Sequence, residues 1–194
     1  EITKEQIGLD SRFNLLDADS GLTVSPGHFL IGVGRAAGHF VQHDGVTQVA
    51  MSSPWGAQDV NTNQVTVVGA WGGLGELIVS NGTFTTRQRT FVGGVATNDY
   101  VIGDSINGKT GSRHLEYHDA EGLVRVAGGT FTANREIFVG KDGSGTFEIG
   151  SRGVVTGTEM NLMSSTATLK FALDAENGYR SGESSVKKLV VAEG

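Results

Sequence analysis

Apolar and polar residues alternate in short runs along most of this chain, and clusters of glycine separate the runs. The pattern is clearest between Val124 and Val155, where the alternating apolar pairs are Val124/Val126, Ile137/Val139 and Phe147/Ile149. Alternation with a period of two predicts half-buried strands, and glycine clusters predict tight turns between them. We therefore expect a succession of short strands joined by glycine-containing corners.

A hydrophobic residue followed by glycine recurs every 34 to 37 residues, at Val33-Gly34, Val68-Gly69, Ile102-Gly103 and Val139-Gly140. A second strand follows each of these dipeptides, and a third can be aligned in two of the units. A repeat of about 35 residues with three short strands predicts one turn of a solenoid. The expected fold is all-β, a right-handed parallel β-helix (β-solenoid). A β-sandwich is the alternative, against which the repeat argues.

Stacked turns of such a solenoid place like residues above one another. The first inward ladder is predicted to contain Phe40, Leu77, Leu115 and Phe147, and the second Val33, Val68, Ile102 and Val139. The aligned corner positions are Asp44, Asn81, Asp119 and Ser151. Short polar side chains suit corners because they bond to their own backbone.

The first 26 residues do not follow the repeat. Thr3 and Gln6 have the spacing of a capping box, and Phe13 and Leu16 would share a helical face with Ile7. A pair of short strands is the alternative. In either case this segment is expected to cap or link to the first turn.

Three regions follow from this division: an N-terminal cap or linking segment (1–26), solenoid repeats (27–166) and a C-terminal coil or cap (167–194). In the last region the pattern predicts strands at 167–173 and 186–192. Because the chain starts without methionine and stops after a strand-like run, we expect it to be a piece of a longer protein.

Composition narrows the functional classes. Thirty glycines and two prolines fit a turn-rich fold, and the absence of cysteine excludes disulfides and thiolate metal sites. A net charge of −6 argues against nucleic-acid binding, which requires a basic face. No run approaches the roughly 20 apolar residues needed to cross a bilayer, so no membrane insertion is expected in this segment.

Two segments of the chain resemble known repeats: IFVGKDGSGTFEIGSRGVVTG (137–157) and ATLKFALD…KKLVVAEG (167–194). They resemble the glycine-rich strand repeats of autotransporter passenger domains and of PEP-CTERM-type bacterial surface proteins. The resemblance covers roughly residues 27–194. It implies a parallel β-helical scaffold in an extracellular or cell-surface location, and it brings no catalytic residues.

Two groups of residues suggest binding sites, one for a metal ion and one for a sugar. His114, Glu116 and His118 would project from one face of a strand, with the spacing of a metal site; shared ancestry with the similar segment at 39–44 is the alternative explanation. Trp55, Trp71 and Tyr100 lie in or beside irregular loops, where exposed aromatic rings typically bind sugars; packing over a corner is the alternative for Trp71.

Catalysis would require paired carboxylates. In the expected alignment, Glu76 leans to the opposite face from Glu116 and Glu148, so no catalytic residue and no cofactor are assigned. The expected function is a non-enzymatic extracellular structural or adhesive module, whose open ends stack on other copies or on further repeats of the chain. A carbohydrate-binding or polysaccharide-cleaving β-helix is the alternative.

Overall fold

The structure is a computed structural model that describes residues 11–24, 29–33, 36–49, 65–94, 120–172 and 184–192. These residues form strands and turns, arranged as six successive coils. The first three coils comprise β1 (Ser11–Leu15), β2 (Gly21–Val24) and β3 (Phe29–Val33); β4 (Ala37–Gln42), β5 (Val46–Val49) and β6 (Val65–Ala70); and β7 (Leu74–Val79), β8 (Thr83–Thr86) and β9 (Arg89–Val92). The last three comprise β10 (Ala120–Ala133) and β11 (Ile137–Val139); β12 (Gly143–Gly157) and β13 (Met160–Leu162); and β14 (Ala167–Phe171), β15 (Ser185–Val186) and β16 (Leu189–Val191).

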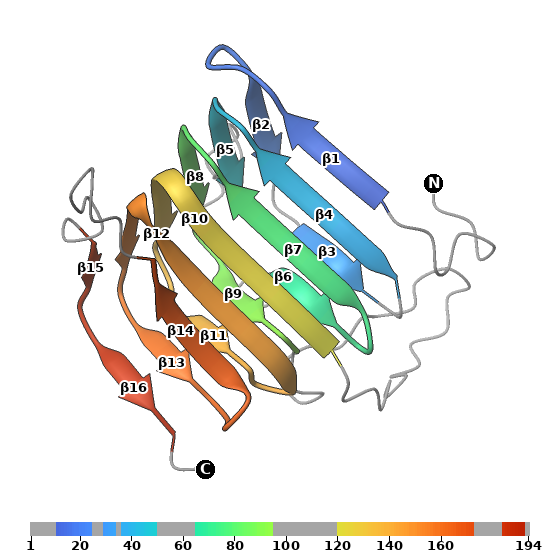
Figure 1. Ribbon diagram of the computed structural model, residues 1–194, viewed down its shortest axis with the longest axis vertical. Coiled ribbons are helices and arrows are strands. Elements are labelled where there is room, and N and C mark those ends of the chain that lie inside the picture. Colours follow the sequence, from blue (N-terminus) through green and yellow to red (C-terminus); the bar gives the residue numbers. More distant parts are fainter. Residues whose placement is uncertain are drawn as a thin grey trace, which may run out of the picture.

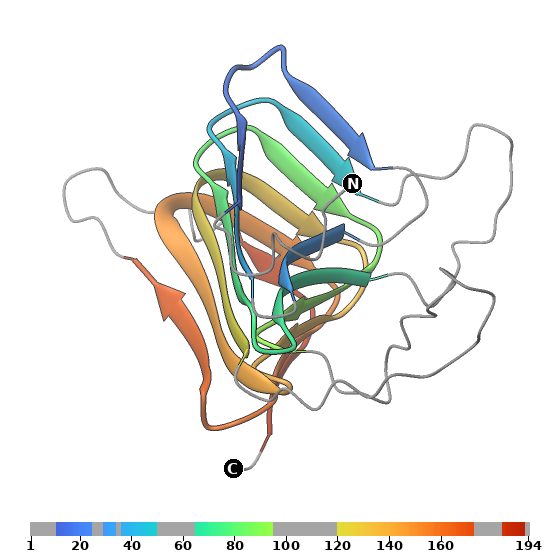
Figure 2. The same cartoon turned by 90° about the vertical axis from the view of Figure 1, so that its right-hand side faces the viewer.

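Every strand pair is parallel, and each coil pairs with the next. The first arm of the large sheet runs β1-β4-β7-β10-β12-β14, and its second arm runs β2-β5-β8-β10-β12-β15. Because β10 and β12 are long enough to pass through both arms, the two arms form one sheet (Figure 1). The smaller sheet runs β3-β6-β9-β11-β13-β16, and the two sheets enclose a common interior (Figure 2). This all-β, all-parallel arrangement is consistent with a parallel β-solenoid.

The coils are not equal in length, which corrects the expected spacing of 34 to 37 residues. One inward column contains Phe13, Phe40, Leu77, Val124, Phe147 and Leu169. Its successive members are 27 (13 to 40), 37 (40 to 77), 47 (77 to 124), 23 (124 to 147) and 22 (147 to 169) residues apart. Strand register keeps the column in line, while the connections between strands vary in length.

The first inward ladder therefore differs from its predicted membership at one level. Phe40, Leu77 and Phe147 lie in the same column, but Val124 pairs with both Leu77 and Phe147. The place expected for Leu115 thus belongs to Val124, and Leu115 lies outside the described residues. An alternating run without a fixed spacing cannot distinguish 113–117 from 122–126.

The second ladder shows the same effect on the smaller sheet. The dipeptides that align are Ile31-Gly32, Val68-Gly69, Val92-Gly93 and Val139-Gly140. Val33 pairs with Ala70 instead, and Ile102 lies outside the described residues. The dipeptide motif is confirmed at Val68 and Val139, but Ile31 takes the place expected for Val33 and Val92 lies between Val68 and Val139, because the chain contains several such dipeptides.

Glycine is required at this corner by both conformation and space. Gly69 and Gly93 have φ of +74°, a region that side chains rarely adopt. A Cβ on Gly69 would lie 1.9 Å from the carbonyl oxygen of Glu121, and one on Gly93 2.0 Å from that of Ser144. The corner therefore brings the backbone of the next coil within a distance that only glycine permits.

The interior is filled by inward side chains of all six coils. Phe13 stacks on Phe40 with ring centroids 5.1 Å apart, and Phe84 stacks on Phe131 at 5.3 Å. Burial of these rings and of the aliphatic columns beside them is the main force that holds coil upon coil.

Both terminal regions join the stack. Residues 11–24 form strands in register with the second coil, so the strand alternative holds for this part of the N-terminal region. β14 and β16 lie within the two strands expected near the C-terminus. The described residues include no helix long and apolar enough to cross a membrane.

Candidate functional site

The outer face of the first arm carries a charged groove of about 350 Å³. Alternation along each strand places the residues between inward apolar positions on this face. The strand register then aligns them in two rows. One row contains Arg12, His39, Glu76, Leu123, Thr146 and Thr168; the other contains Asn14, Val41, Ile78, Arg125, Glu148 and Lys170.

In the first row, His39 on β4 and Glu76 on β7 form a close pair. The Nδ1 atom of His39 lies 2.7 Å from Oε2 of Glu76. Both side chains are largely buried, which shields the contact from solvent more than a surface pair would be. The contact joins the second coil to the third.

In the second row, Arg125 on β10 and Glu148 on β12 join the fourth coil to the fifth. Nη2 of Arg125 donates a hydrogen bond to Oε2 of Glu148 at 3.3 Å, and its Nε lies 2.9 Å from Oε1. Lys170 on β14 is register-paired with Glu148 and extends the row to the sixth coil. Positive and negative side chains therefore follow one another across three coils.

Glu76 and Glu148 face the same side of the sheet, contrary to the sequence-based expectation that they face opposite sides. Their Cα atoms are separated by two strand spacings and two residues, roughly 12 Å in standard sheet geometry. Glu76 contacts His39 and Glu148 contacts Arg125, so both carboxylates have a partner on a neighbouring coil.

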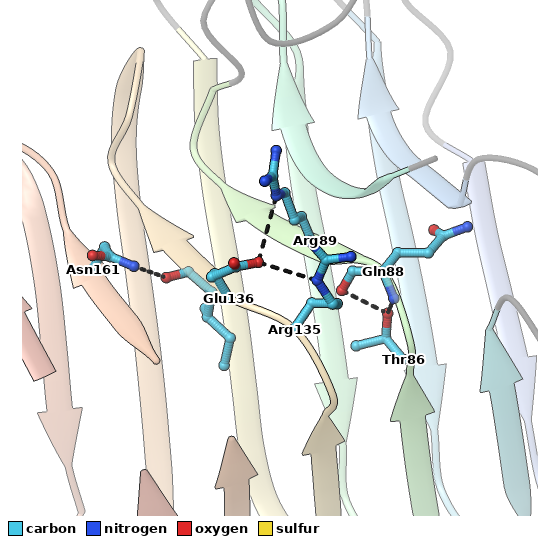
Figure 3. Close-up of polar contacts among 7 residues, drawn as sticks. Thr86, Gln88, Arg89, Arg135, Glu136 and Asn161 are labelled. Carbon is cyan, nitrogen blue, oxygen red and sulfur yellow. Dashed lines mark hydrogen bonds and ion pairs between the residues drawn. The ribbon is translucent and has the colours of Figure 1, made fainter. Parts of the chain in front are cut away.

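A second polar cluster lies where the second arm meets the smaller sheet (Figure 3). The Glu136 carboxylate lies between two arginines, with Oε2 3.4 Å from Nε of Arg89 and 3.4 Å from Nε of Arg135. Burial raises the pKa of Glu136, but a backbone hydrogen bond and the charges of Arg135 and Arg89 outweigh it, so the pKa lies below its ordinary value. Glu136 is therefore a stable anion that ties the third coil to the fourth.

Beside it, buried polar side chains satisfy one another. The hydroxyl of Thr66 lies 3.1 Å from that of Thr86 and donates to Oε1 of Gln88 at 3.3 Å. The backbone N–H of Gln88 donates to the Thr86 hydroxyl at 3.2 Å (Figure 3). These bonds offset the cost of placing amide and hydroxyl groups inside the stack.

The structure corrects the sugar-binding interpretation of Trp71. Its side chain is only 5% exposed and packs in a cluster with Val65, Val67, Ala70 and Phe91. A buried ring cannot stack on a surface sugar, so the packing alternative holds. Trp55 and Tyr100, the other two members of the predicted surface, lie outside the described residues.

The predicted metal ligands His114, Glu116 and His118 also lie outside the described residues. Within the part of the chain that the structure describes, no group of three or more His, Cys, Asp or Glu side chains could hold a metal ion.

The predicted polar corner is observed at Asp44 and Asn81, whereas Ser151, the fourth predicted corner residue, lies within strand β12. Nδ2 of Asn81 donates to Oδ2 of Asp44 at 3.1 Å across two coils, and Asp44 accepts the N–H of Gly45 at 2.7 Å. Asp119 lies outside the described residues. These side chains shape the turn and leave no open ligand position.

The charged rows were missed in the sequence because their members belong to different coils. Only the strand register brings His39 to Glu76, 37 residues later, or Arg125 to Glu148. In the sequence, each charged residue stands next to an inward apolar residue. That position predicts that its side chain lies on the outer face of the sheet, but not which residue of another coil it contacts.

Searches of protein-family models, curated proteins and solved structures found no significant match to this chain.

Proposed function

We propose that this chain is a non-enzymatic structural module, a right-handed β-solenoid displayed outside the cell as a scaffold or adhesive element. The observation that carries the proposal is the continuity of the stack: all six coils pair in register, through both sheets. The resemblance of its repeats to those of bacterial surface proteins supports the location.

The distribution of charge supports a scaffold role. Arg89–Glu136, Arg125–Glu148 and Lys188–Glu159 are ion pairs between neighbouring coils, and His39–Glu76 is a close polar contact of the same kind. Side chains that neutralise each other across coils hold the stack in register and leave little unbalanced charge for catalysis. Individually such pairs contribute about 0.2–1 kcal/mol, so their effect depends on their repetition.

The decisive experiment is native affinity electrophoresis in gels that contain a panel of neutral and acidic polysaccharides. The expected result is unretarded migration with no cleared zone in any gel. Retardation or clearing would contradict a purely structural role.

The groove supports a second candidate, carbohydrate binding. Its rim offers charged donors and acceptors, including Glu121, Arg125 and Lys170, around an apolar patch formed by Leu74 and Leu123. If a polysaccharide retards the chain, Glu121→Gln and Lys170→Ala should each weaken the retardation. Thr132→Ala, an outward residue on the other arm, serves as the control and should leave it unchanged.

A further inference from the structure

The C-terminal end of the stack is open, with core positions exposed. Phe171, Leu189 and Val191 are register-paired with Ile149, Met160 and Leu162, all of which face the interior. Yet these three last-coil side chains are 55%, 53% and 66% exposed. Large apolar side chains gathered at one end of a molecule mark an interaction surface.

The N-terminal end also exposes apolar side chains. An apolar groove of about 530 Å³ lies at the first and second coils, lined by Phe13, Leu22, Phe29 and Phe40 among others. Phe13, the first member of the inward column, is 47% exposed. Both ends of the stack therefore present apolar surface.

The strands at both ends of the stack have edges that are open to further pairing. Among the described strands, β1, β2 and β3 pair only with the second coil, and β14, β15 and β16 pair only with the fifth. Each edge strand has a row of backbone donors and acceptors facing away from the stack, a template for further pairing. Both ends therefore offer apolar contact and hydrogen bonds together.

We propose that the sixth coil of one molecule docks on the first coil of a second copy, head to tail, with the register found between coils inside the molecule. The proposal rests on the scaffold role above and names its partner. Continuing the inward columns places Leu169 on Phe13, Leu189 on Phe29 and Val191 on Ile31. On the outer face of the first arm, Lys170 meets Asn14 and Thr168 meets Arg12, so at these two positions a charged side chain meets a neutral one.

A second copy fits these ends because it repeats an interface that the chain already forms between its coils. Parallel pairing requires unlike ends to meet, since two like ends would bring the strands together antiparallel and out of column. A contact between unlike ends does not close on itself, so association is open-ended and grows with concentration. The N- and C-terminal coils thus determine polarity as well as affinity.

The absence of cysteine allows a direct test of register. Paired Cα atoms on neighbouring strands are about 4.8 Å apart, within the range a disulfide spans. The double variant Asn14→Cys/Lys170→Cys, oxidised at high concentration, should give a ladder of reducible oligomers on a non-reducing gel. Each single variant, which can crosslink only like ends, should remain monomeric.

A shifted pair is the matched control. Arg12→Cys/Lys170→Cys displaces one cysteine by two residues along the same exposed face, so its yield of oligomers should be at least several-fold lower. Dimers from Lys170→Cys alone, or equal yields from the two double variants, would overturn the proposed polarity and register.

Sedimentation velocity of the unmodified chain tests the contact itself. Val191→Lys, an exposed side chain whose replacement leaves the fold intact, should weaken self-association at least tenfold. Val46→Lys puts the same charge on a 42% exposed residue of the second coil, away from both ends, and should leave association unchanged. A strict monomer at every concentration would overturn the proposed stacking but would not affect the scaffold role. Retardation by a polysaccharide would contradict the scaffold role but would not affect the proposed stacking.

Discussion

Two regions of the stack have the same parallel strand pairing but differ in the side chains that fill their interiors. The insertion-bearing coils, residues 37–94, bury polar side chains: Gln42, Thr47, Thr66, Thr86, Gln88 and Thr90. The compact coils, residues 120–162, turn inward only apolar side chains among their described strands; their buried Asn161 pairs with the outward Phe138. The compact coils also have a short spacing, 23 residues from Val124 to Phe147, against 37 from Phe40 to Leu77.

The comparison shows that parallel register tolerates polar groups inside when they find partners. Gln42 donates to the carbonyl oxygens of Gly45 at 2.8 Å and of Asn81 at 3.4 Å, which ties two corners together. In the described part of the compact coils the inward side chains are apolar and depend on close packing of rings and branched side chains; the buried Asn161 donates from Nδ2 to the carbonyl oxygen of Ile137 at 3.5 Å. We therefore expect core truncation to be most damaging in the compact coils, and removal of an unpaired hydroxyl to be favourable in the others.

The largest effect should come from Phe131→Ala in the compact coils. The ring is fully buried, stacks on Phe84 at 5.3 Å and meets Phe147 edge-on at 5.6 Å. Truncation of such a residue lowers the free energy of unfolding by about 3–5 kcal/mol. Equilibrium unfolding in urea measures it, and a loss below 1 kcal/mol would show that the interior is loosely packed.

Gly93→Ala should have the next largest effect, because it acts on the corner common to both regions. Alanine would adopt an unfavourable φ, at about 1–2 kcal/mol, and its Cβ would meet the carbonyl oxygen of Ser144. Gly157→Ala is the control, since a Cβ there meets nothing nearer than 3.7 Å. Thermal unfolding of the two variants should differ, and equal melting temperatures would refute the close approach.

Thr47→Val should stabilise the insertion-bearing coils. The Thr47 hydroxyl is buried without a hydrogen-bond partner, directly beside Phe84 in the register. Replacing it with a methyl group removes a desolvation cost of about 1–3 kcal/mol. Urea unfolding should shift to a higher midpoint; a lower midpoint would mean that the hydroxyl has a partner such as a buried water.

The smallest effect should be that of Glu136→Gln, and it should depend on pH. Since the pKa of Glu136 is lowered in the folded chain, the carboxylate contributes stability above its unfolded pKa of about 4.3. That contribution disappears as pH falls through the lowered value. The variant should be less stable than wild type by about 0.2–1 kcal/mol near pH 7, and the difference should vanish once the pH falls below the lowered pKa of Glu136. A pH-independent difference would exclude the proposed electrostatic origin.

Most of the predicted ladder residues were aligned correctly in both regions: Phe40, Leu77 and Val68 in the insertion-bearing coils, and Phe147 and Val139 in the compact coils. Apart from Val33, the differences fall beside the longest connection. There the predicted alignment chose Ile102 and Leu115, whereas the register places Val92 and Val124 in the columns, because long connections change the spacing. The candidate site was less predictable still, since the charged contacts between coils join residues 23 to 47 positions apart.

The sequence by itself determined the type of element, the inward and outward sides of each strand and the need for glycine at the corners. These properties depend on a residue and its near neighbours, through alternation and backbone conformation. Only the tertiary structure decided which strands pair, which charges meet and that Trp71 is buried. Those outcomes depend on the strand register between coils. This register cannot be read from the sequence, because the connections between strands vary in length.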